Sequence, residues 1–402
     1  MQGWAQNTDN TSRSNQNIDI HLSFIISVPS STPTDSTIYI AGNFPDDKMW
    51  RADAFTLTKS QNNKYNGTIK LPANFHLQFK ITRGSWETVE KNIQGYEIPN
   101  REIDLNHDKT ITITVQSWAD QLEPADNQNN TPKHKSTLTG TIKTHQSIHS
   151  KYLNRDRTIL VYLPPDYDDP DYQNMHYPVL YMHDGQNLFN AATSFAGVEW
   201  SADETAQSLI TRNKIKPLII IAINNTQDRI KEYTPTVDEA LGGGQGDDYE
   251  NFIINELKPL IDRTYRTLPD RDNTAVAGSS LGGLISLDLI WKHPEIFSRA
   301  AVISPSLFWN QQHLIREIEN KNKINPLFKK TKIWIDIGTK EGGDSDPADS
   351  TNDVKRLAKA LASKGLKQET NYHLSIIKNG QHNESAWAKR FDQILLYLYN
   401  NQ

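Results

Sequence analysis

The pattern of apolar and polar positions changes near residue 137. Before that point, short segments alternate apolar and polar residues and are separated by turn-forming residues, at 18–29, 37–42, 65–71, 74–82 and 110–115. Such alternation is typical of half-buried strands, because successive side chains of a strand point to opposite faces. We therefore predict a small all-β, immunoglobulin-like sandwich over residues 18–118.

Beyond residue 137, longer apolar runs alternate with segments of helical period. The runs lie at 158–163, 178–182, 217–223, 274–277, 300–303, 332–337 and 373–377. Strands this apolar are buried on both faces of a parallel sheet, so helices must cover both sides. This predicts an α/β domain over residues 138–402. The polar segment 119–137, which contains prolines and asparagines, is the expected linker, and residues 1–17 are expected to be disordered.

The segment from Gly278 to Gly283 carries the strongest chemical signal of the chain. Its sequence, Gly-Ser-Ser-Leu-Gly-Gly, follows the apolar run 274–277 and precedes an apolar helical pattern that ends before Pro294. A G-x-S-x-G motif between a strand and a helix is the nucleophile elbow of α/β-hydrolases. We predict that Ser280 is a nucleophile in an α/β-hydrolase fold.

A serine nucleophile needs a base, and the base in turn needs a group that orients it. His382 follows the last predicted strand and precedes the last predicted helix, so we expect it at the sheet edge to which the elbow points. Glu341 follows the strand 332–337 and is the expected acid. Asp344, Asp346 and a Ser–His pair without an acid stay open as alternatives.

An oxyanion hole requires two backbone N–H groups directed at the developing charge. One is expected from Leu281, the residue after the nucleophile. The other is expected from Gly185 or Gln186, in the loop that follows the apolar run 178–182.

Composition narrows the function classes. The 402 residues include no cysteine, so disulfides, thiolate metal sites and a cysteine nucleophile are excluded. A net charge of −5 gives no reason to expect nucleic acid or an anionic membrane as partner. No apolar run is long enough to span a bilayer. No signal peptide is visible, and the polar start would suit a mature secreted or periplasmic protein.

Residues from about 138 to 400 resemble the esterase family related to enterochelin esterases and feruloyl esterases. The resemblance is carried by residues 181–189, 229–235, 265–269, 278–283, 304–306 and 382–387. It implies a serine carboxylesterase without metal or cofactor, with Ser280, His382 and a strand-end acid at Glu341, where relatives often carry aspartate. Trp200, Tyr233 and Trp309 would line the substrate pocket or belong to the core.

Residues 18–118 resemble a starch-binding module. The matching stretches are 38–43, 67–72, 79–83, 99–101 and the tryptophans Trp50, Trp86 and Trp118. The resemblance implies sugar binding through Trp50 and Trp86, with Asn100 as a polar companion, independently of catalysis. The insertion 87–99 departs from the expected length, and an inert packing domain is the alternative.

Together these features predict a serine carboxylic-ester hydrolase that acts through an acyl-enzyme on acyl or feruloyl esters of carbohydrates. Alternatives are a siderophore esterase, a sugar acyltransferase, and a carbohydrate-binding protein with an idle hydrolase domain. The acyl group, the alcohol and the oligomeric state are left open by the sequence.

Overall fold

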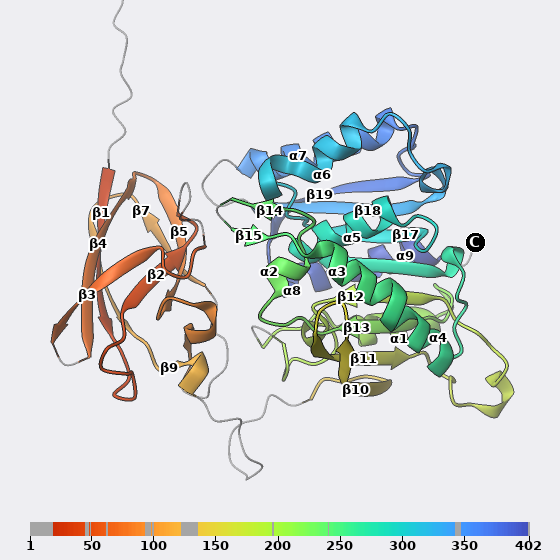
Figure 1. The fold of residues 1–402 in the computed structure, drawn as a ribbon, viewed down its shortest axis with the longest axis horizontal. Helices are drawn as coiled ribbons and strands as arrows, with labels where there is room; N and C mark the ends of the chain where they lie inside the picture. Colours follow the sequence, from red (N-terminus) through yellow and green to blue (C-terminus); the bar gives the residue numbers. More distant parts are fainter. Residues whose placement is uncertain are drawn as a thin grey trace, which may run out of the picture.

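The chain folds into two groups of strands, each with its own apolar core (Figure 1). The structure, a computed structural model, describes residues 19–44, 48, 50–61, 63–92, 98, 100–121, 136–194, 197–239, 241–341 and 347–400. We call residues 19–121 the front unit and residues 136–400 the rear unit. The predicted disordered start, most of the predicted linker, and Asp344 and Asp346 lie outside the described residues.

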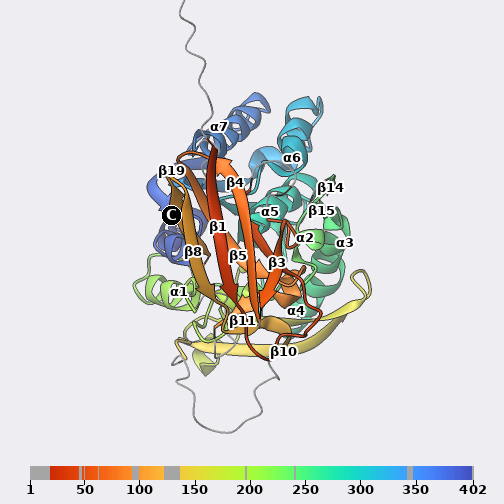
Figure 2. The same cartoon turned by 90° about the vertical axis from the view of Figure 1, so that its left-hand side faces the viewer.

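The front unit is all-β, as predicted. Seven strands form one continuous order, β7-β5-β2-β3-β4-β1-β8, and two short strands pair beside them. Figure 2 shows β1 between β4 and β8, antiparallel to the first and parallel to the second. The strands are β1 (Asp19–Ser27), β2 (Ile38–Gly42), β3 (Phe55–Gln61), β4 (Lys64–Pro72), β5 (Phe75–Thr82), β6 (Glu90–Lys91), β7 (Arg101–Leu105), β8 (Lys109–Thr114) and β9 (Ser117–Trp118).

Alternation along the strands creates the core of the front unit. In β1, Leu22, Phe24 and Ile26 are buried, whereas the residues between them are exposed or half-buried. The strands β3 and β7 were not predicted, because their polar and charged positions hide the alternation. Two separate sheets, which an immunoglobulin-like sandwich requires, are not delimited by the continuous pairing of the described strands, so that finer assignment stays a prediction.

The rear unit is built on an eight-stranded sheet of order β10-β11-β13-β12-β16-β17-β18-β19. The six strands from β13 to β19 in this order are parallel, and β10 and β11 are antiparallel at one edge. The strands are β10 (Thr141–Ser150), β11 (Arg155–Leu163), β12 (Val179–His183), β13 (Ile219–Ile223), β16 (Thr274–Ser279), β17 (Arg299–Ile303), β18 (Lys332–Lys340) and β19 (Tyr372–Gln381).

Helices cover both faces of this sheet, as predicted for strands that are apolar on both sides. One core joins the sheet to α3 (Gly246–Asn251), the π-helical segment η6 (Phe252–Leu257), α4 (Lys258–Thr264), α5 (Leu281–Lys292), α6 (Trp309–Asn320) and α7 (Pro347–Ser363). The core on the other face joins it to α1 (Ala202–Thr211) and α9 (Phe391–Tyr399). Two shorter helices, α2 (Arg229–Glu232) and α8 (Glu384–Ala388), lie in loops at the carboxyl ends of the parallel strands.

Three local features differ from the sequence prediction. Strand β10 was not predicted, because most of its side chains are exposed or half-buried and the apolar signal is weak. The last predicted helix is divided into α8 and α9 at Arg390. The π-helical segment η6 was not predicted, and α4 follows it with Pro259 in its first turn, where a helix tolerates proline. Within the described residues, no helix has the length and apolar character needed to cross a bilayer.

Candidate active site

Ser280 stands at a sharp turn between strand and helix. β16 ends at Ser279 and α5 begins at Leu281, and Ser280 between them has φ 59° and ψ −125°. This backbone conformation is strained for an L-residue and is held by its surroundings. The Ser280 N–H donates to the carbonyl of Ile303, 3.1 Å away, and the Ser280 carbonyl accepts from Leu284 at 3.1 Å.

The turn is possible only because its neighbours lack side chains. A Cβ on Gly278 would lie 2.7 Å from the backbone of Gly282 and 2.8 Å from the ring of His183. A Cβ on Gly283 would lie 2.8 Å from the carbonyl oxygen of Ile303. These approaches are too short for a Cβ, so packing requires glycine at positions 278 and 283.

The structure brings His382 and Glu341 together. His382 follows the end of β19, and its Nδ1 lies 3.1 Å from Oε2 of Glu341. The Glu341 carboxylate is fully buried, whereas the His382 side chain is 38% exposed. The ring of His382 also packs edge-to-face on Trp387, with ring centroids 5.0 Å apart. The imidazole is thus held at one nitrogen and one face.

A polar network behind Glu341 fixes the carboxylate. Its Oε1 accepts from the Gly338 N–H at 2.7 Å and from the Ser304 hydroxyl at 2.8 Å. The Ser304 hydroxyl in turn accepts from the Trp387 indole and from Arg390, and Arg390 forms two hydrogen bonds to Asp336. Oε2 therefore remains for His382.

This network was not predicted from the sequence. Asp336 is buried within its strand, and its partner Arg390 carries no motif of its own. Ser304 lies in the stretch 304–306, which contributes to the resemblance without an assigned role. In the structure, Ser304 stands in a strained backbone position at the end of β17, with a positive φ of 41°.

The Ser280 hydroxyl faces a second serine in this conformation. Its Oγ lies 3.3 Å from Oγ of Ser306, and either atom can donate. Ser280 and His382 both line the same cavity. For His382 to take its proton, the Ser280 side chain has to turn from Ser306 towards the imidazole. Hydrogen bonds of this kind commonly tighten only when substrate is bound.

The expected oxyanion-hole residues flank Ser280. Leu281 is the first residue of α5, and the first N–H groups of a helix have no partner within it. Gly185 and Gln186 belong to the 3₁₀ turn η5 (Gly185–Asn187), which follows β12. A Cβ on Gly185 would lie 2.6 Å from the backbone of Ala222, so this turn lies directly on β13. Gln186 lines the cavity, and its side chain accepts from the Asn225 N–H.

An ion pair holds the turn that carries Gln186. Asp184 has φ 58°, and its carboxylate accepts two hydrogen bonds from Arg229, at 2.7 and 2.8 Å, and one from Asn225 at 2.6 Å. Burial alone would raise the pKa of Asp184, but Arg229 and Asn225 outweigh burial and lower it. Asp184 is therefore a permanent anion, and it positions the loop.

His183 is a buried neutral base. Burial lowers its pKa to about 3, and its Nδ1 lies 2.9 Å from the Tyr249 hydroxyl. The ring packs between Tyr233 and Tyr249. Both His183 and Asp184 therefore have structural roles in this loop.

Both units line the cavity above Ser280. It has a volume of about 500 Å³, and its walls include Gln186, Trp200, Asn225, Arg229, Ile230, His382, Glu384 and Trp387 from the rear unit and Lys80, Trp86 and Val89 from the front unit. Of the three predicted substrate-binding residues, Trp200 lines this cavity. Tyr233 and Trp309 are packed in the core instead, where the Trp309 indole donates to the carbonyl of Thr236.

The predicted sugar-binding residues are divided between two places. The rings of Trp50 and Trp86 lie together, with centroids 6.2 Å apart. Trp86, in the short helix η2 (Trp86–Thr88), is 39% exposed and faces the cavity of Ser280. Asn100 lines a separate hollow with Arg101 and Gln116. Because Trp86 and Ser280 share one cavity, glycan binding by this tryptophan would not be independent of catalysis.

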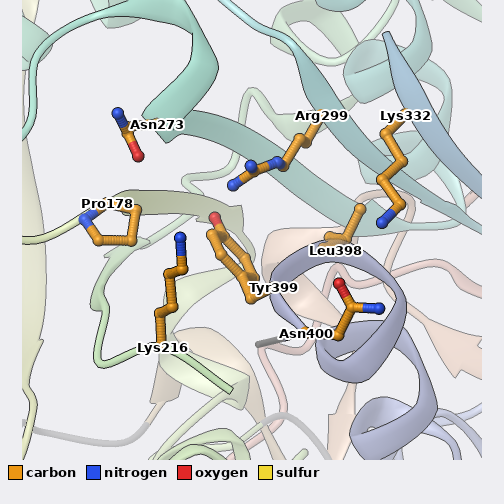
Figure 3. A pocket seen from close by; sticks show the side chains of 8 residues that line it. All are labelled: Pro178, Lys216, Asn273, Arg299, Lys332, Leu398, Tyr399 and Asn400. Atoms are coloured by element: carbon orange, nitrogen blue, oxygen red, sulfur yellow. The ribbon is translucent and has the colours of Figure 1, made fainter. Parts of the chain in front are cut away.

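A smaller hollow lies at the opposite edge of the rear sheet (Figure 3). Its residues include Lys216, Arg299 and Lys332, which stand at or just before the amino ends of β13, β17 and β18. Active sites of open α/β sheets form at the carboxyl ends of the strands, where Ser280 and His382 lie. The cavity of Ser280 is therefore the candidate active site.

Known proteins include relatives of the rear unit. A family model described as "Putative esterase" matches residues 150–398. The uncharacterized protein YbbA of Bacillus subtilis is 27% identical over 258 residues, which are 62% of this chain and 95% of YbbA. The endo-1,4-beta-xylanase/feruloyl esterase of Xylanibacter ruminicola is 26% identical over 285 residues, which are 70% of this chain and 35% of that protein.

The front unit has a different set of relatives. An alpha-amylase of Niallia circulans is 40% identical over 103 residues, which are 25% of this chain and 8% of the amylase.

Among solved structures, the enterobactin esterase FES of Shigella flexneri, crystallised in the presence of enterobactin, is similar over both units. It covers 94% of this chain and 92% of its own, with a TM-score of 0.52 and 15% identity. At that identity the likeness concerns the fold.

Proposed function

The chain belongs to this esterase family, and we propose that it hydrolyses carboxylic esters through Ser280, His382 and Glu341. The observation that carries the proposal is the hydrogen bond between the buried Glu341 carboxylate and His382, beside a serine on a strained elbow in one cavity. A carboxylate that orients an imidazole beside a hydroxyl is the arrangement that activates serine.

Each residue has a defined part in the proposed reaction. Nε2 of His382 takes the proton of Ser280 as the Oγ forms a bond to the ester carbonyl carbon. The tetrahedral oxyanion is stabilised by the N–H groups of Leu281 and Gln186. When the C–O bond to the alcohol breaks, His382 returns its proton to the alcohol. Water then attacks the acyl-enzyme with the same base, and the acid is released.

Esters that carry a sugar or an aromatic ring suit the cavity best. The wall of the cavity contains the aromatic rings of Trp86, Trp200 and Trp387. Flat apolar ring faces bind sugar rings and aryl groups well. The similarity of the front unit to an alpha-amylase segment supports a carbohydrate as one part of the substrate. The feruloyl esterase relative supports an aromatic acyl group. We therefore propose acyl or feruloyl esters of carbohydrates as the substrate class.

The test is turnover of p-nitrophenyl acetate by the full chain and by its Ser280→Ala variant. Loss of the nucleophile should reduce turnover about a millionfold, because only binding and the oxyanion hole remain. Ser286→Ala is a matched control, since this buried serine of α5 donates to the carbonyl of Gly282 away from the cavity. A Ser280→Ala protein with a tenth of wild-type activity would refute the assignment.

A substrate panel then separates the alternatives. Feruloylated and acetylated sugars should be turned over faster than a catecholate siderophore ester. Faster cleavage of the siderophore would favour the siderophore esterase. Acyl transfer to an added sugar at the expense of hydrolysis would identify an acyltransferase. Absence of turnover on every ester would leave a carbohydrate-binding protein with an idle hydrolase fold.

A further inference from the structure

We propose that Glu199, Asp203 and Glu204 form a calcium site at the start of α1. The three residues come from the end of the loop after η5 and from the first turn of the helix. One carboxylate oxygen from each lies within 4.8 Å of the others. Two oxygens bound to one Ca²⁺ at about 2.4 Å can be at most about 4.8 Å apart, so these spacings allow a shared ion.

The carboxylates are buried and incompletely satisfied. Asp203 is fully buried and Glu199 is 7% exposed. Among the described residues, Glu199 Oε2, Asp203 Oδ1 and Glu204 Oε2 are buried without a hydrogen-bond partner. The second oxygen of Asp203 accepts from the Thr139 N–H at 2.7 Å. Buried polar atoms are nearly always paired, so three unpartnered oxygens in one cluster of carboxylates indicate a missing partner.

In the part of the chain that the structure describes, no cationic side chain compensates this group. Within the described residues, none of the three carboxylates forms an ion pair with a lysine, arginine or histidine. The amino end of α1 offers only about half a positive charge, which does not balance three carboxylates. Burying unpaired charge is costly, so the group must either hold protons or bind a cation.

A second acidic cluster in the same protein shows the contrast. Asp247, Glu250 and Asp288 also lie within reach of one another. There the Nζ of Lys292 lies 2.8, 3.8 and 2.7 Å from their respective carboxylates. Lys292 provides the cation of that cluster, whereas no described residue does so for the cluster at Glu199. An ion from solution would fill the equivalent place.

Oxygen donors of this charge select a hard divalent cation. Calcium accepts six to eight oxygens in flexible geometry, whereas magnesium requires a near-ideal octahedron. The ion would join three parts of the rear unit: residues 137–139, which contact this region through Thr137 and Thr139, the loop that ends at Glu199, and α1. Trp200, next to Glu199, lines the active-site cavity, so the ion would also stiffen that wall. No catalytic step involves it.

The experiment uses the full chain, freed of metal with EGTA and titrated with Ca²⁺ by calorimetry. We expect one Ca²⁺ per chain and a Tm that rises with the logarithm of the Ca²⁺ concentration. Tb³⁺ should bind in place of Ca²⁺ and show luminescence sensitised by Trp200, because the two would be adjacent. Added Ca²⁺ should quench that luminescence by competition.

Matched variants locate the ion. Glu204→Gln, at a half-buried position that tolerates change, should abolish both the Ca²⁺-dependent rise in Tm and the Tb³⁺ signal, as should Asp203→Asn. Asp247→Asn, in the cluster that contains Lys292, should leave both unchanged. The proposal is overturned if Ca²⁺ does not change the wild-type Tm, if Mg²⁺ raises it more than Ca²⁺, or if binding survives in Glu204→Gln. If the wild-type protein binds no Ca²⁺ and the Asp203→Asn protein is more stable than the wild type, the carboxyl groups share protons and hold no ion.

Discussion

Replacing Glu341 with glutamine tests the proposed acid by the change of a single atom. Oε1 of Glu341 accepts from the Gly338 N–H and from the Ser304 hydroxyl, so the amide oxygen of glutamine will occupy that position. The NH₂ group must then face Nδ1 of His382, where the carboxylate now accepts. An NH₂ group can only donate, so the imidazole must carry its proton on Nε2. It can then no longer accept the proton of Ser280.

The expected loss follows from two effects of this substitution. The imidazole is fixed in the wrong tautomer, and the charge that stabilises the imidazolium is removed. For a triad acid these effects together reduce kcat about 10⁴-fold, which corresponds to about 5.4 kcal/mol of activation free energy. KM should change little, because Glu341 is buried away from the cavity surface. The fold should persist, since Arg390 keeps both hydrogen bonds to Asp336.

The assay is steady-state hydrolysis of p-nitrophenyl acetate, with thermal unfolding measured on the same samples. Glu384→Gln is the control, because this carboxylate lines the same cavity but accepts from Asn187 rather than from His382. The kcat of Glu384→Gln should fall less than about tenfold, as expected for a group that takes no part in the proton transfer. If Glu341→Gln retains more than about a tenth of wild-type kcat while Asp344→Asn or Asp346→Asn does not, the acid has been misassigned.

Two further outcomes are expected. Burial lowers the pKa of His183 to about 3, below its value of 6.5 in the unfolded chain, so the unfolded state binds an extra proton below pH 6.5. The free energy of unfolding should therefore fall by about 2 kcal/mol between pH 8 and pH 5 through this group, and urea titrations should show a shallower fall in His183→Asn. Trp86→Ala should raise KM for feruloylated oligosaccharides severalfold and leave kcat/KM for p-nitrophenyl acetate within about twofold, since one lost ring contact is worth about 1 kcal/mol. Equal losses on both esters would place Trp86 outside the substrate-binding wall.

The features that could be predicted from the sequence follow from a local motif or from the general geometry of a parallel sheet. Ser280 could be proposed because an elbow needs glycines at fixed positions between a strand and a helix, and six consecutive residues are enough to recognise that pattern. Glu341 and His382 could be proposed because the carboxyl ends of parallel strands meet at one edge. Their proximity in the structure, 3.1 Å between Nδ1 and Oε2, follows from the strand order β18-β19.

Other features depend on distant contacts and left no local pattern. Arg390 reaches Asp336 from 54 positions away, and nothing in the residues around either one signals the pairing. Strand β10 lies at the edge of the sheet, where few positions need to be apolar. Trp86 resembles a surface sugar platform in sequence, and only the packing of the front unit against the loops of the rear unit brings it to the cavity of Ser280.

The buried carboxylates near the carboxyl edge of the rear sheet have different hydrogen-bonded partners. These partners indicate which carboxylates have a structural role and which one can take part in the proposed reaction. Asp184 is paired with Arg229 and Asp336 with Arg390. Both partners are permanently charged, so these two pairs can only hold the loops in place, and Arg390 also lies 3.6 Å from Oε1 of Glu341. The hydrogen-bonded partner of Glu341 on the cavity side is His382, the proposed base of the reaction. A carboxylate that faces a group able to gain and lose a proton favours the state in which the proton has been gained. The proposed reaction requires that state of His382 when Ser280 attacks an ester, and we therefore propose Glu341, among these carboxylates, as the one that assists it.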